Sequence, residues 1–230
     1  MDQISFGTDG WRAALDQFTD RRVRIVGQAV ADTLAEAGAR AGAETDGADG
    51  AERPVVVGYD ARPTSEGFAE SLAEVLAGNG FDVLLPERDC PTPLVAHAIV
   101  ERGAAGAMMV TASHNPPEYN GVKFIPEDGA PALPEVTERI EANLRDPDLT
   151  AAGTDAEGAI ERVDLVTPHA EHARDLVAAE GSLDLSGLTV AYDAMPGSGR
   201  GVTDALLESA GAEVERLRCE RDPEFGGGAP

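Results

Sequence analysis

The chain has 230 residues, of which 42 are acidic and 18 basic, and its formal net charge is −24. That length supports one large domain or two modest ones, while so negative a charge argues against nucleic acid and anionic membranes as partners, because phosphate binding needs clustered Lys and Arg. No apolar run approaches the ~20 residues of a membrane span, and no signal-peptide-like segment opens the chain, so we expect a cytoplasmic location.

The first predicted element is a glycine-punctuated segment, residues 4–12, that ends in Arg12. Gly7 and Gly10 permit tight turns, and the Arg12 guanidinium can reach a phosphate or carboxylate with two hydrogen bonds. A surface loop with a solvated arginine would have the same pattern. A helix is then predicted from apolar residues at helical spacing, namely Val23, Val26, Val30 and Leu34. Residues 38–53 show no periodicity and are predicted to form a loop.

Strands and helices alternate through the next part of the chain. The strands are short apolar runs at residues 54–60, 81–85 and 107–110, and the helices between them cover residues 65–76 and 92–103. This order predicts a three-layer α/β/α domain with a mostly parallel mixed sheet and right-handed crossovers. Ligands of such sheets collect at the carboxyl ends of the strands, where Asp60, Arg62 and Ser113 lie.

A polar, turn-rich loop at residues 113–121 follows the third strand, and a further strand resumes at residues 122–125. The loop presents Ser113 and His114 at the mouth of the sheet, and the Asn120-Gly121 pair is predicted to form its closing turn. Lys123, just past that turn, is the only lysine in the chain. An amine has a tunable pKa, whereas a guanidinium stays charged, so a lone lysine here favours a chemical role.

A second domain is predicted after a helix that carries Val136, Ile140 and Leu144. Residues 146–158, rich in Asp, Pro, Gly and Ala, are the predicted linker, and they divide the chain into domains at residues 1–150 and 151–230. The second domain repeats the strand–helix–strand plan and stops short of a complete fold. Its predicted elements are a helix at 167–181, a strand at 187–192, a helix at 202–210 and a strand at 212–217.

Several patterns admit two interpretations. A serine next to a histidine suggests a hydrolase nucleophile, but the chain has no G-x-S-x-G elbow, and prolines follow in place of a helix. His169 and His172 can share a helix face and bind a metal, or be solvated helix residues, while His97 is expected to pack in a helix. The glycine-rich residues 193–201 lack a P-loop pattern and favour a structural turn. A serine flanked by cationic groups suits phosphoryl chemistry instead.

Residues 111–123, Thr-Ala-Ser-His-Asn-Pro-Pro-Glu-Tyr-Asn-Gly-Val-Lys, resemble the active-serine motif of the α-D-phosphohexomutases, the phosphoglucomutase/phosphomannomutase family. Further segments similar to this family lie at residues 6–12, 57–62, 91–93 and 193–201. The resemblance implies transfer of a phosphoryl group between C1 and C6 of a hexose phosphate, through a phosphoserine at Ser113 and a bisphosphorylated sugar. It also implies acid–base and charge-stabilising roles for Lys123 and Arg12, with His114 supporting the site.

The sequence departs from this family in length. Members are longer enzymes that hold Mg²⁺ with an aspartate-rich loop of the Asp-Gly-Asp-x-Asp-Arg type, which this sequence lacks. Ser113 would then contribute to the metal only through an oxygen of its phosphate. We therefore expect an N-terminal part of a mutase that is inactive alone. The alternative is a non-catalytic phosphosugar-binding or assembly module completed by a partner chain. Glucose, mannose and glucosamine phosphates all remain open as substrates.

The acidic composition has a separate implication. Extreme surface acidity with a single lysine is typical of proteins that stay soluble in concentrated salt, where screening removes most self-repulsion. A GC-rich codon bias would also favour Ala, Gly, Arg and Asp. We expect a halophilic protein of haloarchaeal type.

Overall fold

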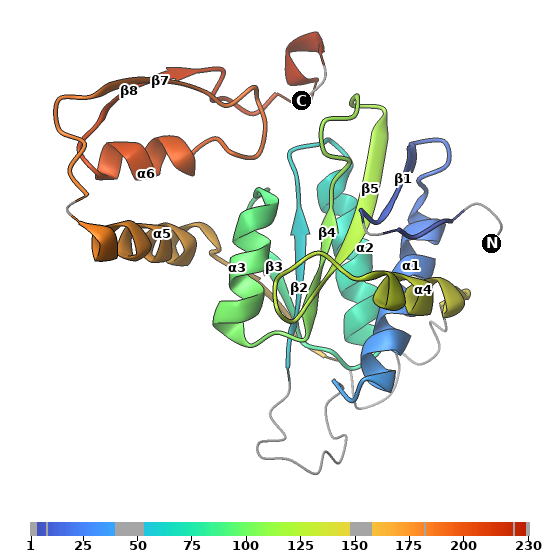
Figure 1. The fold of residues 1–230 in the computed structure, drawn as a ribbon. Helices are drawn as coiled ribbons and strands as arrows, with labels where there is room; N and C mark the ends of the chain where they lie inside the picture. Colours follow the sequence, from blue (N-terminus) through green and yellow to red (C-terminus); the bar gives the residue numbers. More distant parts are fainter. Residues whose placement is uncertain are drawn as a thin grey trace.

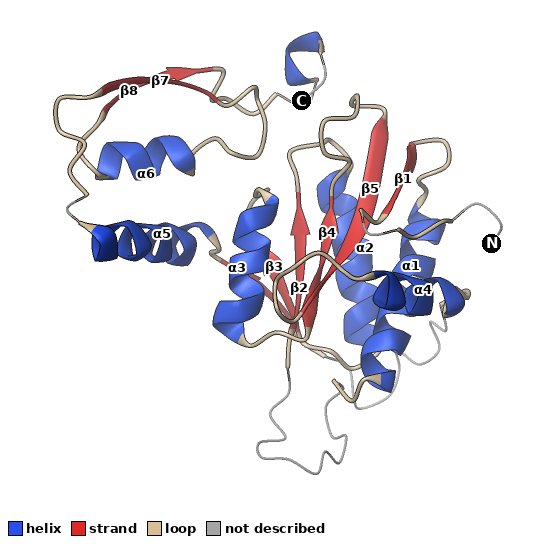
Figure 2. Ribbon diagram, viewed as in Figure 1, coloured by secondary structure: helices blue, strands red, loops and turns tan. Residues whose placement is uncertain are grey.

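The computed structural model describes residues 4–7, 9–39, 53–147, 158–181, 183–222 and 224–228. Most of the predicted loop at 38–53 and of the predicted linker at 146–158 lies outside these ranges. The elements in chain order are β1 (Trp11–Ala14), α1 (Asp20–Glu36), β2 (Val55–Tyr59), α2 (Ser65–Gly78), β3 (Val83–Pro86), α3 (Thr92–Arg102), β4 (Gly106–Val110), β5 (Tyr119–Pro126), α4 (Pro134–Ala142), β6 (Ile160–Val163), α5 (Val166–Glu180), β7 (Thr189–Asp193), α6 (Thr203–Ser209), β8 (Glu213–Leu217) and a 3₁₀ turn (Phe225–Gly227). Figures 1 and 2 show a helix-covered sheet and, beside it, a smaller unit.

The larger sheet has six strands in the order β1-β5-β4-β2-β3-β6. Strands β4, β2, β3 and β6 run parallel to one another, whereas β5 pairs antiparallel with both β4 and β1. The right-handed twist of strands and the helical crossovers α2 and α3 account for the parallel part. The predicted fold class, an α/β domain with a mostly parallel mixed sheet, is confirmed.

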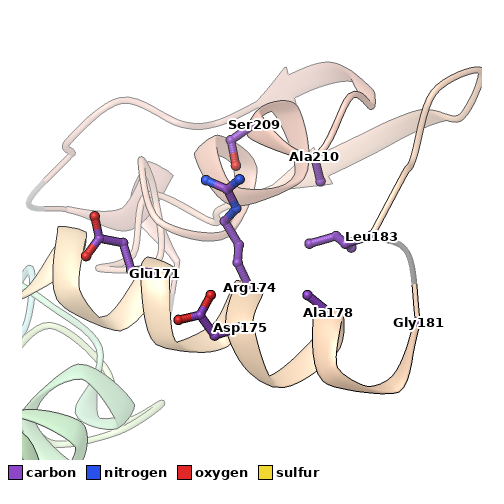
Figure 3. A pocket seen from close by; sticks show the side chains of 8 residues that line it. All are labelled: Glu171, Arg174, Asp175, Ala178, Gly181, Leu183, Ser209 and Ala210. Atoms are coloured by element: carbon purple, nitrogen blue, oxygen red, sulfur yellow. The ribbon is translucent and has the colours of Figure 1, made fainter.

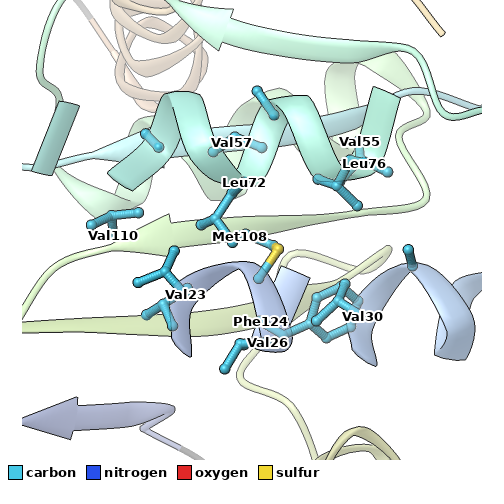
Figure 4. Packing of buried hydrophobic residues seen from close by; sticks show 14 of the residues in the cluster. Val23, Val26, Val30, Val55, Val57, Leu72, Leu76, Met108, Val110 and Phe124 are labelled. Carbon is cyan, nitrogen blue, oxygen red and sulfur yellow. The ribbon is translucent and has the colours of Figure 1, made fainter. Parts of the chain in front are cut away.

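Helices cover both faces of this sheet, so its central strands are buried on both sides. On one face, Val55 and Val57 of β2 pack with Met108 and Val110 of β4 against apolar residues of α1 and α2 (Figure 4). On the other face, Val56 packs with residues of α3. Burial of alternate residues on opposite faces explains why β2 and β4 read as continuous apolar runs in the sequence.

Both edge strands of the sheet were absent from the prediction. Strand β1 buries only Trp11 fully, and β6 buries only Val163, so neither shows the period-2 alternation of a half-buried strand. Strand β6 lies beyond the predicted domain boundary at residue 150, yet it pairs with β3 in the first sheet. The division at residue 150 stays a prediction. The sheet of the first domain takes β6, its last strand, from residues beyond that boundary.

The predicted turn at Asn120-Gly121 is wrong, because both residues lie inside β5, which begins at Tyr119. Asn120 is fully buried and donates hydrogen bonds from Nδ2 to the hydroxyls of Thr64 and Ser65, at 3.0 Å each. These tertiary contacts override the turn preference of an Asn-Gly pair. The serine-bearing loop therefore closes earlier, before Tyr119.

The smaller unit contains β7 and β8, which pair in parallel, with α6 as their crossover, as the strand–helix–strand prediction required. A buried ion pair ties it to the larger sheet: Arg200 donates to the Asp89 carboxylate at 2.6 and 2.7 Å. Arg88 also donates to the carbonyl oxygen of Arg200 at 2.8 Å. Within the described ranges, no helix is long and apolar enough to cross a membrane.

Candidate active site

The loop that carries Ser113 is fixed at the carboxyl end of β4. The Thr111 amide donates to the carbonyl oxygen of Gly121 at 2.9 Å, which continues the pairing with β5 beyond the end of the strand. The Ser113 amide then donates to the Thr111 hydroxyl at 3.0 Å. Ser113 itself has φ +56°, in the left-handed region that side-chain-bearing residues rarely adopt. The result is an exposed serine held out from the sheet edge.

Ser113 and His114 come together as the sequence suggested. The hydroxyl oxygen of Ser113 lies 3.2 Å from Nδ1 of His114, which is a hydrogen-bonding distance. Both side chains are exposed. An imidazole at this distance can hold or accept a proton at the serine oxygen. It can equally orient a group attached to that oxygen.

Arg12 and Lys123 lie on one face of the sheet. Arg12 of β1 is paired with Gly121, and Lys123 follows two residues later on β5, so both side chains project to the same side. Lys123 is half-buried. Burial lowers the pKa of its amine, the charge of Arg12 lowers it further, and Asp9 opposes both effects. The structure thus brings the two predicted cations together and makes Lys123 easier to deprotonate.

Glycine at position 10 permits this close arrangement. A Cβ at Gly10 would lie 2.7 Å from both Cα and Cβ of Lys123, and the residue has φ +79°. Arg12 is anchored loosely, with its guanidinium 4.0 Å from the Asp9 carboxylate. Its Nε–H is buried without a hydrogen-bond partner in the described part of the chain. In that same part, no hydrogen bond joins Ser113 to Arg12 or Lys123.

A residue that the sequence placed only at the sheet edge proves central to the loop. Arg62 has no exposed surface, and its guanidinium donates to the carbonyl oxygens of Ser113 at 2.9 Å and Asn115 at 2.7 Å. Burial lowers the pKa of this guanidinium, and the nearby Asp60 carboxylate opposes the shift. The signal in the sequence was an Asp-x-Arg segment directly after a buried strand, but nothing there indicated which groups the arginine would bind.

Three of the four histidines gather away from Ser113, between α3 and α5. The ring of His97 lies 4.7 Å from that of His172 and 5.6 Å from that of His169, between centroids. Burial lowers the pKa of His169, as do the neighbouring His97 and His172. No group of three or more His, Cys, Asp and Glu among the described residues is arranged to hold a metal ion. The three rings thus make contacts between α3 and α5.

A pocket of about 500 Å³ lies between α5 and the end of α6 (Figure 3). Its lining includes the charged residues Glu171, Arg174 and Asp175 of α5, facing Ser209 of α6. None of the four predicted site residues borders this pocket. It has no part in the arrangement around Ser113.

The Mg²⁺ that the resemblance implies needs several hard oxygen ligands, usually carboxylates and phosphate. The described residues contain no cluster of acidic or other ligating side chains that fits a metal ion. The two groups in contact with the Ser113 hydroxyl and amide are an imidazole and another hydroxyl. The residues present do not fit the ion, so no step below passes through it.

The fold and the site together define an α/β domain that presents an exposed serine at the carboxyl end of β4, with two cations on one face of the adjoining strands β1 and β5. The model of the family described as phosphoglucomutase/phosphomannomutase, alpha/beta/alpha domain I, matches residues 3–151. The chain belongs to the phosphoglucomutase/phosphomannomutase family.

Individual relatives agree with this assignment. A phosphoglucosamine mutase of Synechococcus sp. (strain WH7803) is 36% identical over 96% of this chain and 44% of its own length. A phosphoglucomutase of Komagataeibacter xylinus is 28% identical over 97% of this chain and 41% of its own length. The crystal structure of a candidate phosphomannomutase from Thermus thermophilus matches with a TM-score of 0.84 and 33% identity, over 99% of this chain and 48% of that one. The chain thus spans less than half the length of these relatives.

Proposed function

We propose that this chain is the phosphoserine-carrying part of a phosphohexomutase, an isomerase that moves a phosphoryl group between C1 and C6 of a hexose phosphate. The observations that carry the proposal are the exposed Ser113 with its left-handed backbone after the carboxyl end of β4, and Arg12 and Lys123 on one face of the adjoining strands β1 and β5. The relatives, a phosphoglucosamine mutase and a phosphoglucomutase, support a hexose phosphate as the substrate.

The proposed chemistry is a pair of phosphoryl transfers. In the first, the bond between phosphorus and the Ser113 oxygen breaks as a sugar hydroxyl forms a new bond to phosphorus. The sugar hydroxyl gives up its proton to a base of the site, and the released serine oxygen takes up a proton to become a hydroxyl again, so atoms and charge balance. The bisphosphorylated sugar then turns over, and its other phosphoryl group returns to Ser113 with the reverse proton movement.

The side chains of the site have distinct roles in this scheme. Lys123, with its lowered pKa, takes or returns a proton, because an amine titrates closer to neutrality when it is desolvated. Arg12 stabilises the negative charge of the transferring phosphoryl group, since its buried Nε–H has no partner among the described residues. His114 orients the serine oxygen from 3.2 Å.

The relatives extend well beyond the matched region, so we propose that the isolated chain does not turn over hexose phosphates. Assays with glucose 1-phosphate and glucosamine 6-phosphate would compare this chain with a fusion to the C-terminal part of the Synechococcus relative. A fusion with Ser113→Ala is the matched control. We expect turnover from the fusion alone. A fusion that is equally active with and without Ser113 would refute the proposal. Binding of hexose phosphate without any phosphoryl transfer by the fusion would favour the phosphosugar-binding module instead.

We also propose that the domain division at residue 150, a cytoplasmic location and halophilic adaptation hold for this protein. Support for the last comes from 42 acidic side chains against 18 basic ones, with one lysine among the 18. Repulsion between surface carboxylates weakens as the Debye length falls from about 10 Å at 0.1 M salt to about 3 Å at 1 M. Concentrated salt therefore favours the compact state of such a chain.

A further inference from the structure

Arg62 makes contacts that the proposed phosphoryl transfers do not use. Its side chain has no exposed surface, and all five of its N–H groups donate hydrogen bonds. One bond goes to the Asp60 carboxylate, 3.2 Å from Nε. The other four go to main-chain carbonyl oxygens of one loop, those of Ser113 (2.9 Å), Asn115 (2.7 Å), Pro116 (2.8 Å) and Tyr119 (3.1 Å).

The loop depends on these bonds for its shape. It has few bonds of its own: the Asn115 amide donates to Ala112 at 3.1 Å, and the Tyr119 amide donates to Pro116 at 3.0 Å. Ser113 adopts φ +56°, which is unfavourable for a residue with a Cβ. Such a conformation persists only where the surroundings hold it. The planar guanidinium supplies that hold, because its donors are fixed relative to one another.

Arg62 is itself fixed by the elements on which the loop rests. The Asp60 carboxylate accepts from the Arg62 amide at 3.1 Å and from the Ser65 hydroxyl at 2.6 Å. Ser65 in turn accepts from the Asn120 side chain at 3.0 Å, and the Gly121 amide donates to Asn120 Oδ1 at 2.8 Å. The end of β2, the start of α2 and the start of β5 are thus joined in one network. A displacement of the guanidinium would break its bonds to Asp60, after the end of β2, and to Tyr119, at the start of β5.

An aromatic ring from the other end of the chain covers the guanidinium. The ring centroid of Phe225 lies 5.9 Å from Cζ of Arg62, within the range of a cation–π contact. Phe225 is itself buried, with 5% of its surface exposed. Excluding water from the guanidinium strengthens its hydrogen bonds to the loop.

We propose that Arg62 is the positioning residue of the phosphoserine site, a role that rests on the function proposed above. Arg62 holds the backbone at Ser113 and on its C-terminal side, and so sets the direction in which the serine oxygen points. It does not touch the serine hydroxyl. It acts through the four carbonyl groups, and a lysine, with a point charge and three donors, cannot replace it.

The test compares Arg62→Lys with Arg53→Lys in the full chain. Arg53 is a matched control because it also donates to two carbonyl oxygens, those of Gly103 at 3.1 Å and Ala104 at 2.9 Å. These groups precede the amino end of β4, whereas the loop follows its carboxyl end. Two readouts are needed. Hydrogen–deuterium exchange of peptides covering residues 111–121 and 106–110 reports the order of the loop and of β4. Mass spectrometry, applied to the same variants in the fusion proposed above, reports phosphorylation of Ser113 by glucose 1,6-bisphosphate.

For Arg62→Lys we expect exchange in residues 111–121 to rise about tenfold while residues 106–110 stay protected, since at least two hydrogen bonds are lost. Phosphorylation of Ser113 should slow by at least about the same factor. Arg53→Lys should leave both unchanged. Equal exchange in the loops of the wild type and Arg62→Lys would overturn the proposal, as would a uniform rise in both peptides.

If Arg62→Lys does not fold, Asp60→Asn is measured instead, because it keeps the arginine and removes its charged anchor. Faster exchange confined to residues 111–121 would support the positioning role, and unchanged loop exchange would overturn it. Absence of phosphate on wild-type Ser113 would count against the proposed function alone, because exchange still tests the hold of Arg62 on the loop.

Discussion

Gly121 leaves no room for a side chain where β5 meets β1 and the end of β4. A Cβ at this position would lie 2.6 Å from the carbonyl oxygen of Thr111, 2.7 Å from Cγ of Arg12 and 3.0 Å from the carbonyl oxygen of Trp11. Two of these atoms belong to the backbone, so Gly121→Ala must push β5 away from one neighbour. The third contact would displace the Arg12 side chain from the site.

Overpacking of this kind costs about 1–3 kcal/mol in free energy of unfolding. For a chain of this size that corresponds to a fall in Tm of about 2–12 °C. Thermal and urea unfolding, followed by circular dichroism, would measure it. Gly67→Ala is the matched control, because Gly67 lies in α2 with no atom within 4 Å of an added Cβ. That substitution should stabilise the chain by about 0.4–1 kcal/mol. A Gly121→Ala protein as stable as the wild type would refute the close packing described here.

Three further predictions concern charge. Lys123→Arg keeps the positive charge but removes the titratable amine, so phosphoryl transfer to Ser113 in the fusion should fall by about 10²–10⁴ while Tm changes little. Unaltered transfer, measured by mass spectrometry, would exclude an acid–base role. Burial, His97 and His172 lower the pKa of His169. The pKa of His169 is therefore higher in the unfolded chain than in the folded one, so the unfolded chain is protonated first as the pH drops. Tm should be level above about pH 7 and fall as the pH drops below the ordinary histidine pKa. The His169→Gln variant should show a weaker dependence of Tm on pH. An equally steep dependence in the variant would contradict the lowered pKa of His169 in the histidine cluster. The Tm should also rise between about 0.1 and 1 M KCl as repulsion is screened, and a falling Tm would contradict the halophilic proposal.

Much of the fold could be predicted because its central elements carry strong periodicity. Strands β2 and β4 are apolar runs buried on both faces, and α1 shows regular helical spacing, so hydrophobicity alone located them. The edge strands could not be located this way. In β6, three of four residues are exposed, and its pairing with β3 depends on tertiary structure.

The residue types of the site could be predicted from the sequence, but the contacts that position these residues could not. Ser113, His114 and Lys123 stand close together in the sequence, and their chemistry indicates a role without knowledge of the fold. The strand pairing could not be predicted. Arg12 lies on the same face as Lys123 only because β1 pairs with β5, and the segment at residues 4–12, with its two glycines, shows no pattern that indicates this pairing. The role of Arg62 was equally hidden, because its four acceptors on the loop are main-chain carbonyl groups, which every residue has.

The identity of the phosphorylated residue tests the account most directly. The fusion of this chain to the C-terminal part of the Synechococcus relative would be incubated with glucose 1,6-bisphosphate, digested and analysed by peptide mass spectrometry, with the Ser113→Ala fusion as the control. We predict an added mass of ~80 Da, one phosphoryl group, on Ser113 and none on the variant. Phosphate on another residue only, or equal labelling of the Ser113→Ala protein, would contradict the assignment of Ser113 as the phosphoryl carrier.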